Sequence, residues 1–216
     1  MKAVVEARID AWIDEALVQV NHHGGHYLQL RGDAGNRRYA FLHFSMPDGF
    51  RPGVTVRSAI LRCYVAGTNW TGSQNITAVR VDSSWTEQTI TWAAQPTFSN
   101  TNGIVVAVSN ATDGQELELT LTSMLQNVAS GSLFFGVLLS TNVAKAIRLH
   151  SSESTAGGKR PELELEWARI PLPPNDLRPS GDRSVAVSRP VLLWSFRDHF
   201  GDQNQAAAEV EIRSQR

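Results

Sequence analysis

The sequence predicts an all-β protein, a jelly-roll-like β-sandwich with one short helix. Three observations support this fold class. Several short segments alternate between apolar and polar residues, as RYAFLHFSM does at residues 38–46. Turn-forming sequences such as PDG, RPG, TDG and STAGG separate these segments, and helical periodicity is almost absent. Short strands joined by regular turns are typical of sandwiches and jelly rolls.

The expected elements follow in chain order. Alternation indicates strands at residues 38–46, 58–65, 75–81, 115–122 and 161–167. Residues 133–140 (LFFGVLLS) are apolar on both faces and are also expected to form a strand. The one helical pattern covers residues 122–131, with Thr122 as the expected N-cap and Gly131 as the end.

A stretch rich in proline divides the chain at residues 168–183. The segment before it, residues 1–167, holds the strands above and predicts one sandwich module. Beyond it, residues 184–198 and 206–214 predict two or three further strands. So few strands rarely form a stable domain alone. We therefore expect residues 184–216 to be an incomplete domain, or one that another chain completes.

The composition excludes several classes of function. The chain has 20 basic and 21 acidic residues, a balance that does not attract polyanions, so nucleic acid is not an expected partner. Cys63 is the only cysteine and lies in an apolar run, which indicates a buried thiol. The longest apolar run, residues 133–139, has the length of a strand, so membrane insertion is not expected. Residues 1–18 carry acidic side chains and no signal-peptide pattern, so export by that route is not expected.

The order of motifs resembles a known family. DAWIDEA, RRYAFLHFSM, VRSAILRCYV, SSWTEQTITWAAQP, LTSMLQN and HSSESTAGGKRPELELEW follow one another over about residues 5–167. This order resembles the DNRLRE-type (disaggregatase-related) domain family, although the letters DNRLRE are absent. The resemblance implies a β-sandwich module of the kind found in extracellular polysaccharide-active proteins and in minor tail proteins of bacteriophages. It also implies that some members bind acidic polysaccharide.

The C-terminal segment is similar to the opening strands of a fibronectin type III-like or immunoglobulin-like domain. A DNRLRE-like module followed by such a domain resembles minor tail proteins of phages that infect actinobacteria. The resemblance implies a non-enzymatic virion protein, assembled in the host cytoplasm and acting outside the cell. Its expected partners are other tail proteins, further copies of itself with threefold symmetry among the options, and host cell-wall polysaccharide. The alternative is a carbohydrate-binding module of a secreted polysaccharide-degrading enzyme.

The motif at residues 83–96 admits two interpretations. Glu87 with Asp82 resembles the carboxylate pair of a glycosidase, set beside two tryptophans. The alternative, which the family resemblance implies, is a strand, a corner and a second strand, in which Trp85 and Trp92 pack and Glu87 satisfies the turn backbone. We favour the structural interpretation, so no catalytic residue is predicted.

Strand parity predicts a surface of mixed aromatic and charged residues. The family resemblance implies that Ala40, Leu42 and Phe44 face the core, which leaves the alternate side chains of that strand outward, and inward Leu61 and Cys63 do the same for the next strand. The outward residues are Tyr39, Phe41, His43, Arg62 and Tyr64. Rings stack on sugars and arginine binds carboxylates, so these five residues are the predicted glycan or subunit face. The alternative is that a strand, a loop or a neighbouring subunit covers this face.

Three other motifs favour structural explanations. NHHGGHY at residues 21–27 lacks acidic or cysteine ligands at zinc spacing, so we expect a glycine-rich loop and predict no metal and no cofactor. The RGD tripeptide at residues 31–33 is too short to be informative. His150, Ser152 and Glu153 resemble a hydrolase triad in composition, but lie too close together along the chain to form one.

Overall fold

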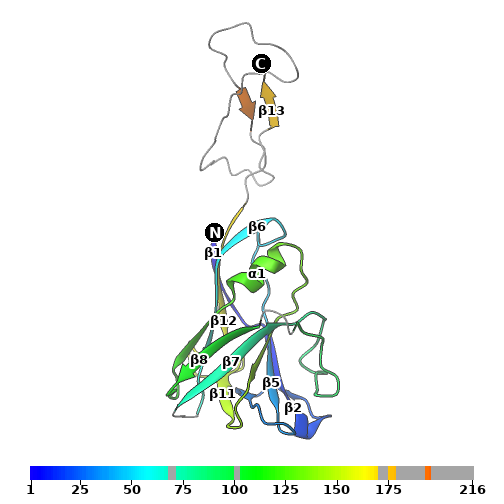
Figure 1. Ribbon diagram of the computed structural model, residues 1–216, viewed down its shortest axis with the longest axis vertical. Coiled ribbons are helices and arrows are strands. Elements are labelled where there is room, and N and C mark those ends of the chain that lie inside the picture. The colour runs from blue at the N-terminus through cyan, green and yellow to red at the C-terminus, as the bar shows by residue number, and fades with distance from the viewer. Residues whose placement is uncertain (68–71, 100–102, 170–174, 179–192, 196–216) are drawn as a thin grey trace, which may run out of the picture. The chain divides into compact units, whose positions relative to one another are not determined.

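A computed structural model describes residues 1–67, 72–99, 103–169, 175–178 and 193–195. The chain forms two compact units, Met1–Ala168 and Arg169–Arg216. Nearly all described residues belong to the first unit, which is shown with its element labels in Figure 1.

The first unit is a sandwich of two antiparallel sheets, which confirms the predicted all-β fold class. One sheet has four strands in the order β1 (Lys2–Glu6), β12 (Glu162–Arg169), β6 (Val54–Tyr64) and β9 (Glu116–Thr120). The other has six strands in the order β3 (His22–His23), β2 (Ile9–Asp14), β5 (Arg38–His43), β10 (Val137–Thr141), β7 (Ser73–Arg80) and β8 (Ile104–Ser109). Neighbouring strands in these sheets are rarely consecutive in the chain, so the chain crosses repeatedly between and within the sheets.

Smaller elements complete the unit. The strands β4 (Tyr27–Leu30) and β11 (Ile147–His150) form a two-stranded sheet. A short 3-10 helix, η1, spans Glu15–Leu17, and the single α-helix of the described residues, α1, spans Thr122–Ala129. No helix of the described residues is long and apolar enough to cross a membrane.

The start of α1 differs from the expected cap. Leu121 occupies the N-cap position, and no side chain caps the helix there. The Thr122 hydroxyl instead accepts a hydrogen bond from the backbone N–H of Ala59 on β6, 3.0 Å away. Thr122 therefore ties the helix to the four-stranded sheet, and the prediction of a Thr122 N-cap is wrong. Gly131, with φ of +107°, stands just beyond the helix end, as expected.

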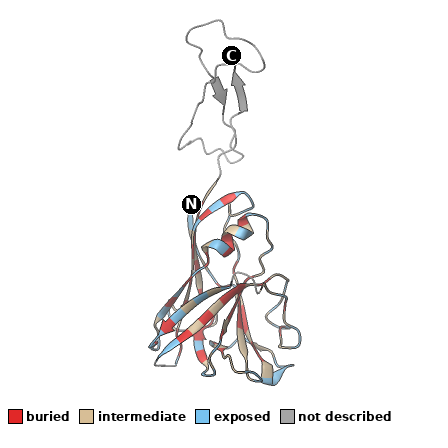
Figure 2. Cartoon of the chain, viewed as in Figure 1, coloured by how far each residue is buried: buried red, intermediate tan, exposed pale blue. Residues whose placement is uncertain are grey.

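Alternate residues of both sheets fill one core. Ala59, Leu61 and Cys63 of β6 and Ala40 and Leu42 of β5 are all fully buried in it. Figure 2 shows the resulting alternation of buried and more exposed residues along the strands. This confirms the predicted inward parity of both strands. Burial also raises the pKa of the Cys63 thiol, so Cys63 is a packing residue.

Strand β10 begins at Val137, so the expectation of a strand from residue 133 is wrong at its start. Gly136 has φ of +117°, and a Cβ there would collide with the backbone carbonyl of Leu42. The chain turns sharply at this glycine, where only a residue without a side chain fits against β5.

Part of the predicted linker is a strand. β13 (Asn175–Arg178) lies within residues 168–183 and pairs antiparallel with β14 (Leu193–Ser195). β14 falls inside the expected strand region 184–198. The remaining predictions for residues 184–216, including the strand at 206–214 and the fibronectin-like or immunoglobulin-like domain, lie outside the described residues.

Candidate functional site

The structure separates the five residues of the predicted glycan face. Tyr39, Phe41 and His43 lie on the outer face of the six-stranded sheet, because Ala40 and Leu42 point into the core. Arg62 and Tyr64 lie on the outer face of the four-stranded sheet by the same parity. The two outer faces are on opposite sides of the sandwich, so the prediction of one shared face is wrong. Parity fixed the direction of each side chain but not which sheet each strand joins.

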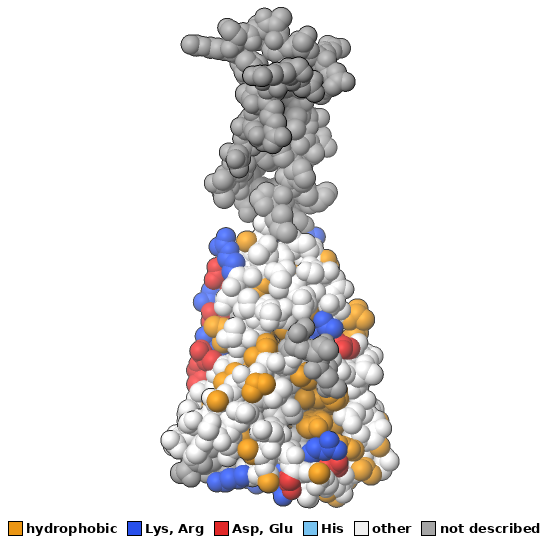
Figure 3. Space-filling view, viewed as in Figure 1, with side chains coloured by type: hydrophobic (Ala, Val, Ile, Leu, Met, Phe, Trp, Pro, Cys, Tyr) orange, Lys and Arg blue, Asp and Glu red, His pale blue; other side chains and the backbone are white. Residues whose placement is uncertain are grey.

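A loop covers the outer face of the six-stranded sheet. Phe41 is fully buried beneath it and belongs to a second apolar core. The ring of Trp85 packs against Phe41 with ring centroids 5.7 Å apart, and Trp92 packs against Tyr39 at 5.0 Å. The buried members of this second core are Ala11, Ile13, Phe41, Val79, Val81, Ile90 and Leu138. Figure 3 shows apolar side chains gathered over β5 and β7 and the loop beside them.

This cover is the motif at residues 83–96. It contains turns but no strand, and an isolated bridge joins Val81 to Phe98 at its base. The expected strand, corner and strand are therefore wrong, because the segment crosses the sheet face and adds no strand to it. The predicted packing roles of Trp85 and Trp92 are confirmed. The Glu87 carboxylate accepts a hydrogen bond from the Gln88 side chain. Among the described residues no backbone N–H donates to it, so the expected turn role of Glu87 is wrong for this part of the chain.

Other side chains anchor the loop. The indole N–H of Trp85 donates to the carbonyl of Phe135 at 2.8 Å. The Asn21 amide donates to the carbonyls of Glu87 and Ile90, at 2.7 and 2.6 Å. Asn21 belongs to the histidine-rich segment at residues 21–27, so this segment also anchors the loop.

A pocket of about 320 Å³ lies where this loop meets the sheet. Its walls are Arg8, Ile9, His43, Ser84, Trp85 and Phe135. The volume is within the range of small-ligand sites. The pocket therefore combines two aromatic rings, a guanidinium, an imidazole and a hydroxyl, which are the groups that recognise sugars by stacking and hydrogen bonding.

His43 lines this pocket and carries an unsatisfied polar atom. Its Nδ1 is enclosed by the protein and has no hydrogen-bond partner among the described residues. Burial lowers the pKa of His43, and the charge of nearby Arg8 lowers it further, so the ring is neutral at pH 7. Arg8 is exposed and forms no ion pair with any residue that the structure describes. A buried imidazole nitrogen without a partner is costly unless a ligand or water supplies one.

The second outer face is ionic, and a pocket of about 300 Å³ at its margin is lined by Glu6, Arg160 and Glu162 and by residues 154–158. Arg62 lies among four glutamates and contacts Glu164 at 2.8 Å and Glu118 at 3.0 Å. It also lies 3.2 Å from Glu116 and 3.6 Å from Glu162. The hydrogen bond with Glu164 raises the pKa of Arg62. Arg62 is therefore engaged by carboxylates of its own chain, and this face does not favour acidic glycans.

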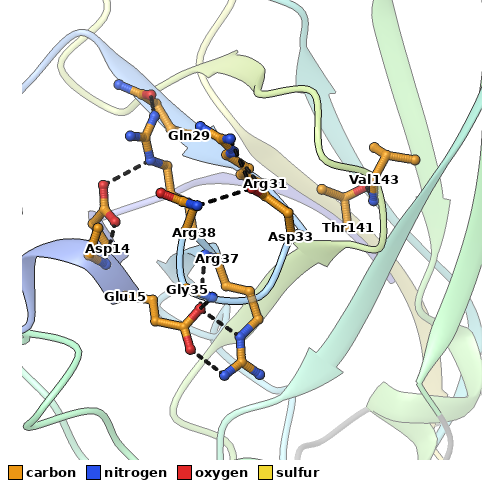
Figure 4. Close-up of polar contacts among 12 residues, drawn as sticks. Asp14, Glu15, Gln29, Arg31, Asp33, Gly35, Arg37, Arg38, Thr141 and Val143 are labelled. Atoms are coloured by element: carbon orange, nitrogen blue, oxygen red, sulfur yellow. Dashed lines mark hydrogen bonds and ion pairs between the residues drawn. The ribbon is translucent and has the colours of Figure 1, made fainter.

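The RGD tripeptide forms a closed local structure, shown in Figure 4. The Arg31 guanidinium donates to both carboxylate oxygens of Asp33, with the Nη2–Oδ2 distance at 2.9 Å. The N–H of Gly32 donates to the carbonyl of Val143 at 2.7 Å, and a Cβ at Gly32 would meet the backbone of the 141–143 segment. The tripeptide is therefore a packing element.

The neighbouring arginines of the same loop are also paired. Arg37 binds Glu15, and Arg38 binds Asp14 at 2.9 Å and the Gln29 side chain at 2.6 Å, as Figure 4 shows. These charges are neutralised within the chain. Arg8 therefore remains the better candidate to meet an anionic or hydroxyl-rich ligand.

The histidine-rich segment is partly a strand. His22 and His23 form β3, and the ring of His22 stacks on Trp12 with centroids 3.7 Å apart. The expectation of a simple loop is therefore wrong at these two positions. Among the residues that the structure describes, no group of three or more metal-ligating side chains converges.

The segment around His150 is held by local hydrogen bonds. The Ser154 hydroxyl contacts His150 Nδ1 at 2.8 Å, and the Ser152 hydroxyl donates to Glu153 at 2.7 Å. Ser152 and Glu153 thus bond to each other and not to His150, so the triad suggested by composition is not formed.

The comparison with known families shows the class of the module. The profile of carbohydrate-binding module family 96 matches residues 1–166 of the 216. The chain belongs to carbohydrate-binding module family 96. No curated protein sequence matches it significantly. The matched span covers both sheets of the CBM96 module, and its family is named for binding carbohydrate, not for catalysis. The narrower resemblance to DNRLRE-type tail proteins stays a prediction.

Most of the pocket was not foreseen from the sequence. The sequence predicted His43 as a residue of the glycan or subunit face and Trp85 as a packing residue. It did not indicate Arg8, Ser84 or Phe135 as site residues. These residues come from segments that are far apart in the chain. Only the strand order β2, β5, β10 brings them together.

Proposed function

We propose that this CBM96 module binds a carbohydrate chain in the pocket formed by Arg8, His43 and Trp85, without catalysing a reaction. The observation that carries the proposal is a pocket walled by the rings of Trp85 and Phe135, with Arg8 and His43 beside them. The His43 imidazole offers a hydrogen-bonding group to a sugar hydroxyl, and the aromatic wall contacts the apolar face of a sugar ring. Arg8 offers its donors to a carboxylate or hydroxyl at the rim.

Binding to soluble polysaccharides tests this proposal. The probes are acidic chains (polygalacturonate, alginate, hyaluronate) and neutral chains (xylan, β-glucan, galactomannan), each titrated by calorimetry. For the chains that bind, we expect Arg8→Gln and His43→Gln to weaken affinity about tenfold each. Arg57→Gln is the matched control, because Arg57 is an exposed arginine on β6, in the opposite sheet, and is 3.7 Å from Glu166.

Unchanged affinity in Arg8→Gln and His43→Gln would move the site elsewhere on the module. Equal loss in Arg57→Gln would indicate a nonspecific charge effect. Absence of binding to every probe by the folded wild type would contradict the proposal itself.

A finer proposal concerns the assembly that carries the module. The motif order and the fibronectin-like C-terminal segment support a minor tail or tail-tip protein of a bacteriophage, located in the virion and attaching to host glycans. The alternative, a binding module of a polysaccharide-degrading enzyme, is equally consistent with family membership. Mass spectrometry of purified virions tests the first. A catalytic domain in the same polypeptide would favour the second.

A further inference from the structure

Strand β8 is an edge of the six-stranded sheet. It pairs with β7 on one side, from Thr77 opposite Val105 to Ser73 opposite Ser109, and has no sheet partner among the described residues on the other. The backbone of Ile104–Ser109 makes no hydrogen bond outside this ladder within the described part of the chain. An edge strand of this kind presents a row of free N–H and C=O groups that can pair with another strand.

The other edges of the sandwich carry features that oppose such pairing. β1 has charged Lys2 and Glu6, and β9 has Glu116 and Glu118. The fourth edge, β3, is only two residues long. Charged side chains and short length are the usual means by which proteins protect an edge strand.

β8 has none of these protections. Its six residues, IVVAVS, include no charge and no proline, and most of them favour strands. Val105 is 58% exposed on the outer face, while Val106 and Val108 pack toward the core on the inner face. The strand is therefore packed on its inner face, and its outer edge has no strand partner among the described residues.

From this contrast we infer that β8 is the surface through which two copies of this chain associate, edge to edge and antiparallel. A strand that pairs antiparallel with its own copy matches itself about a two-fold axis, so one sequence provides both sides of the interface. An uncharged strand meets no like charge in that pairing. The inferred assembly is two-fold, which differs from the threefold option raised by the sequence.

This geometry has a consequence for binding. A two-fold axis between antiparallel strands of one continuous sheet runs perpendicular to the sheet, so both outer faces point to the same side. The two pockets of Arg8, His43 and Trp85 then face the same surface, which favours bivalent attachment to a polysaccharide. This consequence rests on the proposed function, whereas the dimer does not.

Sedimentation velocity of the full chain, from low to high micromolar concentration, tests the dimer. We expect a reversible monomer–dimer equilibrium in the wild type. Val105→Lys should weaken the dimer about tenfold or more, because it places a charge on each copy of the paired edge. Ala107→Lys repeats the test at a second exposed position of β8. The matched control is Val4→Lys on β1, since Val4 is 53% exposed on the edge of the other sheet.

Circular dichroism and thermal unfolding confirm that each variant is folded. A wild type that stays monomeric at every concentration would overturn the inference, as would a dimer that persists in both β8 variants or is lost equally in Val4→Lys. Retention on immobilised polysaccharide separates the two proposals. The Val105→Lys variant should dissociate faster than the wild type from densely immobilised polysaccharide. Its affinity for a short oligosaccharide in solution should equal that of the wild type.

Discussion

The outer face of the six-stranded sheet lies under a loop of aromatic side chains, whereas the outer face of the four-stranded sheet is open and charged. On the first face Phe41 is buried beneath Trp85. On the second, Arg62 holds the glutamates of β9 and β12. Figure 3 shows the charged side chains along the margin where β1 and β12 lie. The two outer faces are therefore stabilised differently. A second apolar core covers one, and a network of partly exposed ion pairs lies on the other.

The outward residues of each sheet account for this difference. Outward positions of the six-stranded sheet include Ala11, Ile13 and Leu138. These apolar side chains stabilise the fold only if another segment buries them. Outward positions of the four-stranded sheet bring opposite charges together across strands, as in the pair Arg62 and Glu118. A covered face can form a pocket with aromatic walls at the margin of its cover, as at Trp85 and Phe135. We therefore place the proposed ligand site on the covered face.

The largest expected effect comes from removing the centre of the second core. Phe41→Ala should lower the free energy of unfolding by about 4 kcal/mol, because it leaves a cavity under Trp85. The matched change on the open face is Ile60→Ala, where Ile60 is only partly buried on β6 and should cost about 1 kcal/mol or less. Urea unfolding measures both. Equal losses would mean that the loop is not a true second core.

An intermediate effect should come from a carboxyl group that belongs to neither outer face. Asp10 is buried and accepts a hydrogen bond from the Ser152 N–H at 2.6 Å. Burial raises its pKa from 3.8 to about 7 against the effect of that hydrogen bond, and nearby Glu153 raises it further. Between pH 4 and 7 the unfolded chain loses this proton while the folded chain keeps it, so this group's contribution to stability falls as pH rises.

Asp10→Asn should remove that pH dependence, because the amide still accepts from Ser152 and carries no charge. We expect the variant to exceed the wild type by roughly 2 kcal/mol at pH 8 and to match it at pH 3. Asp14→Asn is the control: Asp14 is equally buried but pairs with Arg38, so its loss should destabilise the chain. Urea unfolding across this pH range measures all three. A wild type more stable than Asp10→Asn at pH 8 would contradict the assignment.

Side-chain direction could be predicted before the structure, and sheet membership could not. Alternation separated the two sets of side chains on β5 and β6, because it depends only on local period, and the family resemblance assigned Ala40 inward correctly. Which sheet each strand joins depends on long-range pairing, so Phe41 and Arg62 were assigned to one face. The run LFFGVLLS is apolar on both faces, and a strand with two apolar faces must be buried on both. This run was the indication in the sequence that the six-stranded sheet is covered. The sequence predicted that Trp85 and Trp92 are packing residues. The surface against which they pack could be identified only from the fold.

The smallest expected effect comes from the open face. It measures how much the ion pairs of that face contribute to the free energy of unfolding. Arg62→Met keeps an unbranched apolar stem but leaves Glu116, Glu118, Glu162 and Glu164 without their shared cation. We expect a loss of about 1 kcal/mol at low salt, because the pairs are partly exposed and water compensates for much of each one. The loss should shrink in 1 M salt, which screens the repulsion among the four glutamates. Thermal unfolding at both salt concentrations measures this, with Phe41→Ala as the reference because its deficit should not shrink in salt. An Arg62→Met deficit that is equally large in both would mean that the ion pairs do not cause it, and would contradict the contrast between an apolar and an ionic face.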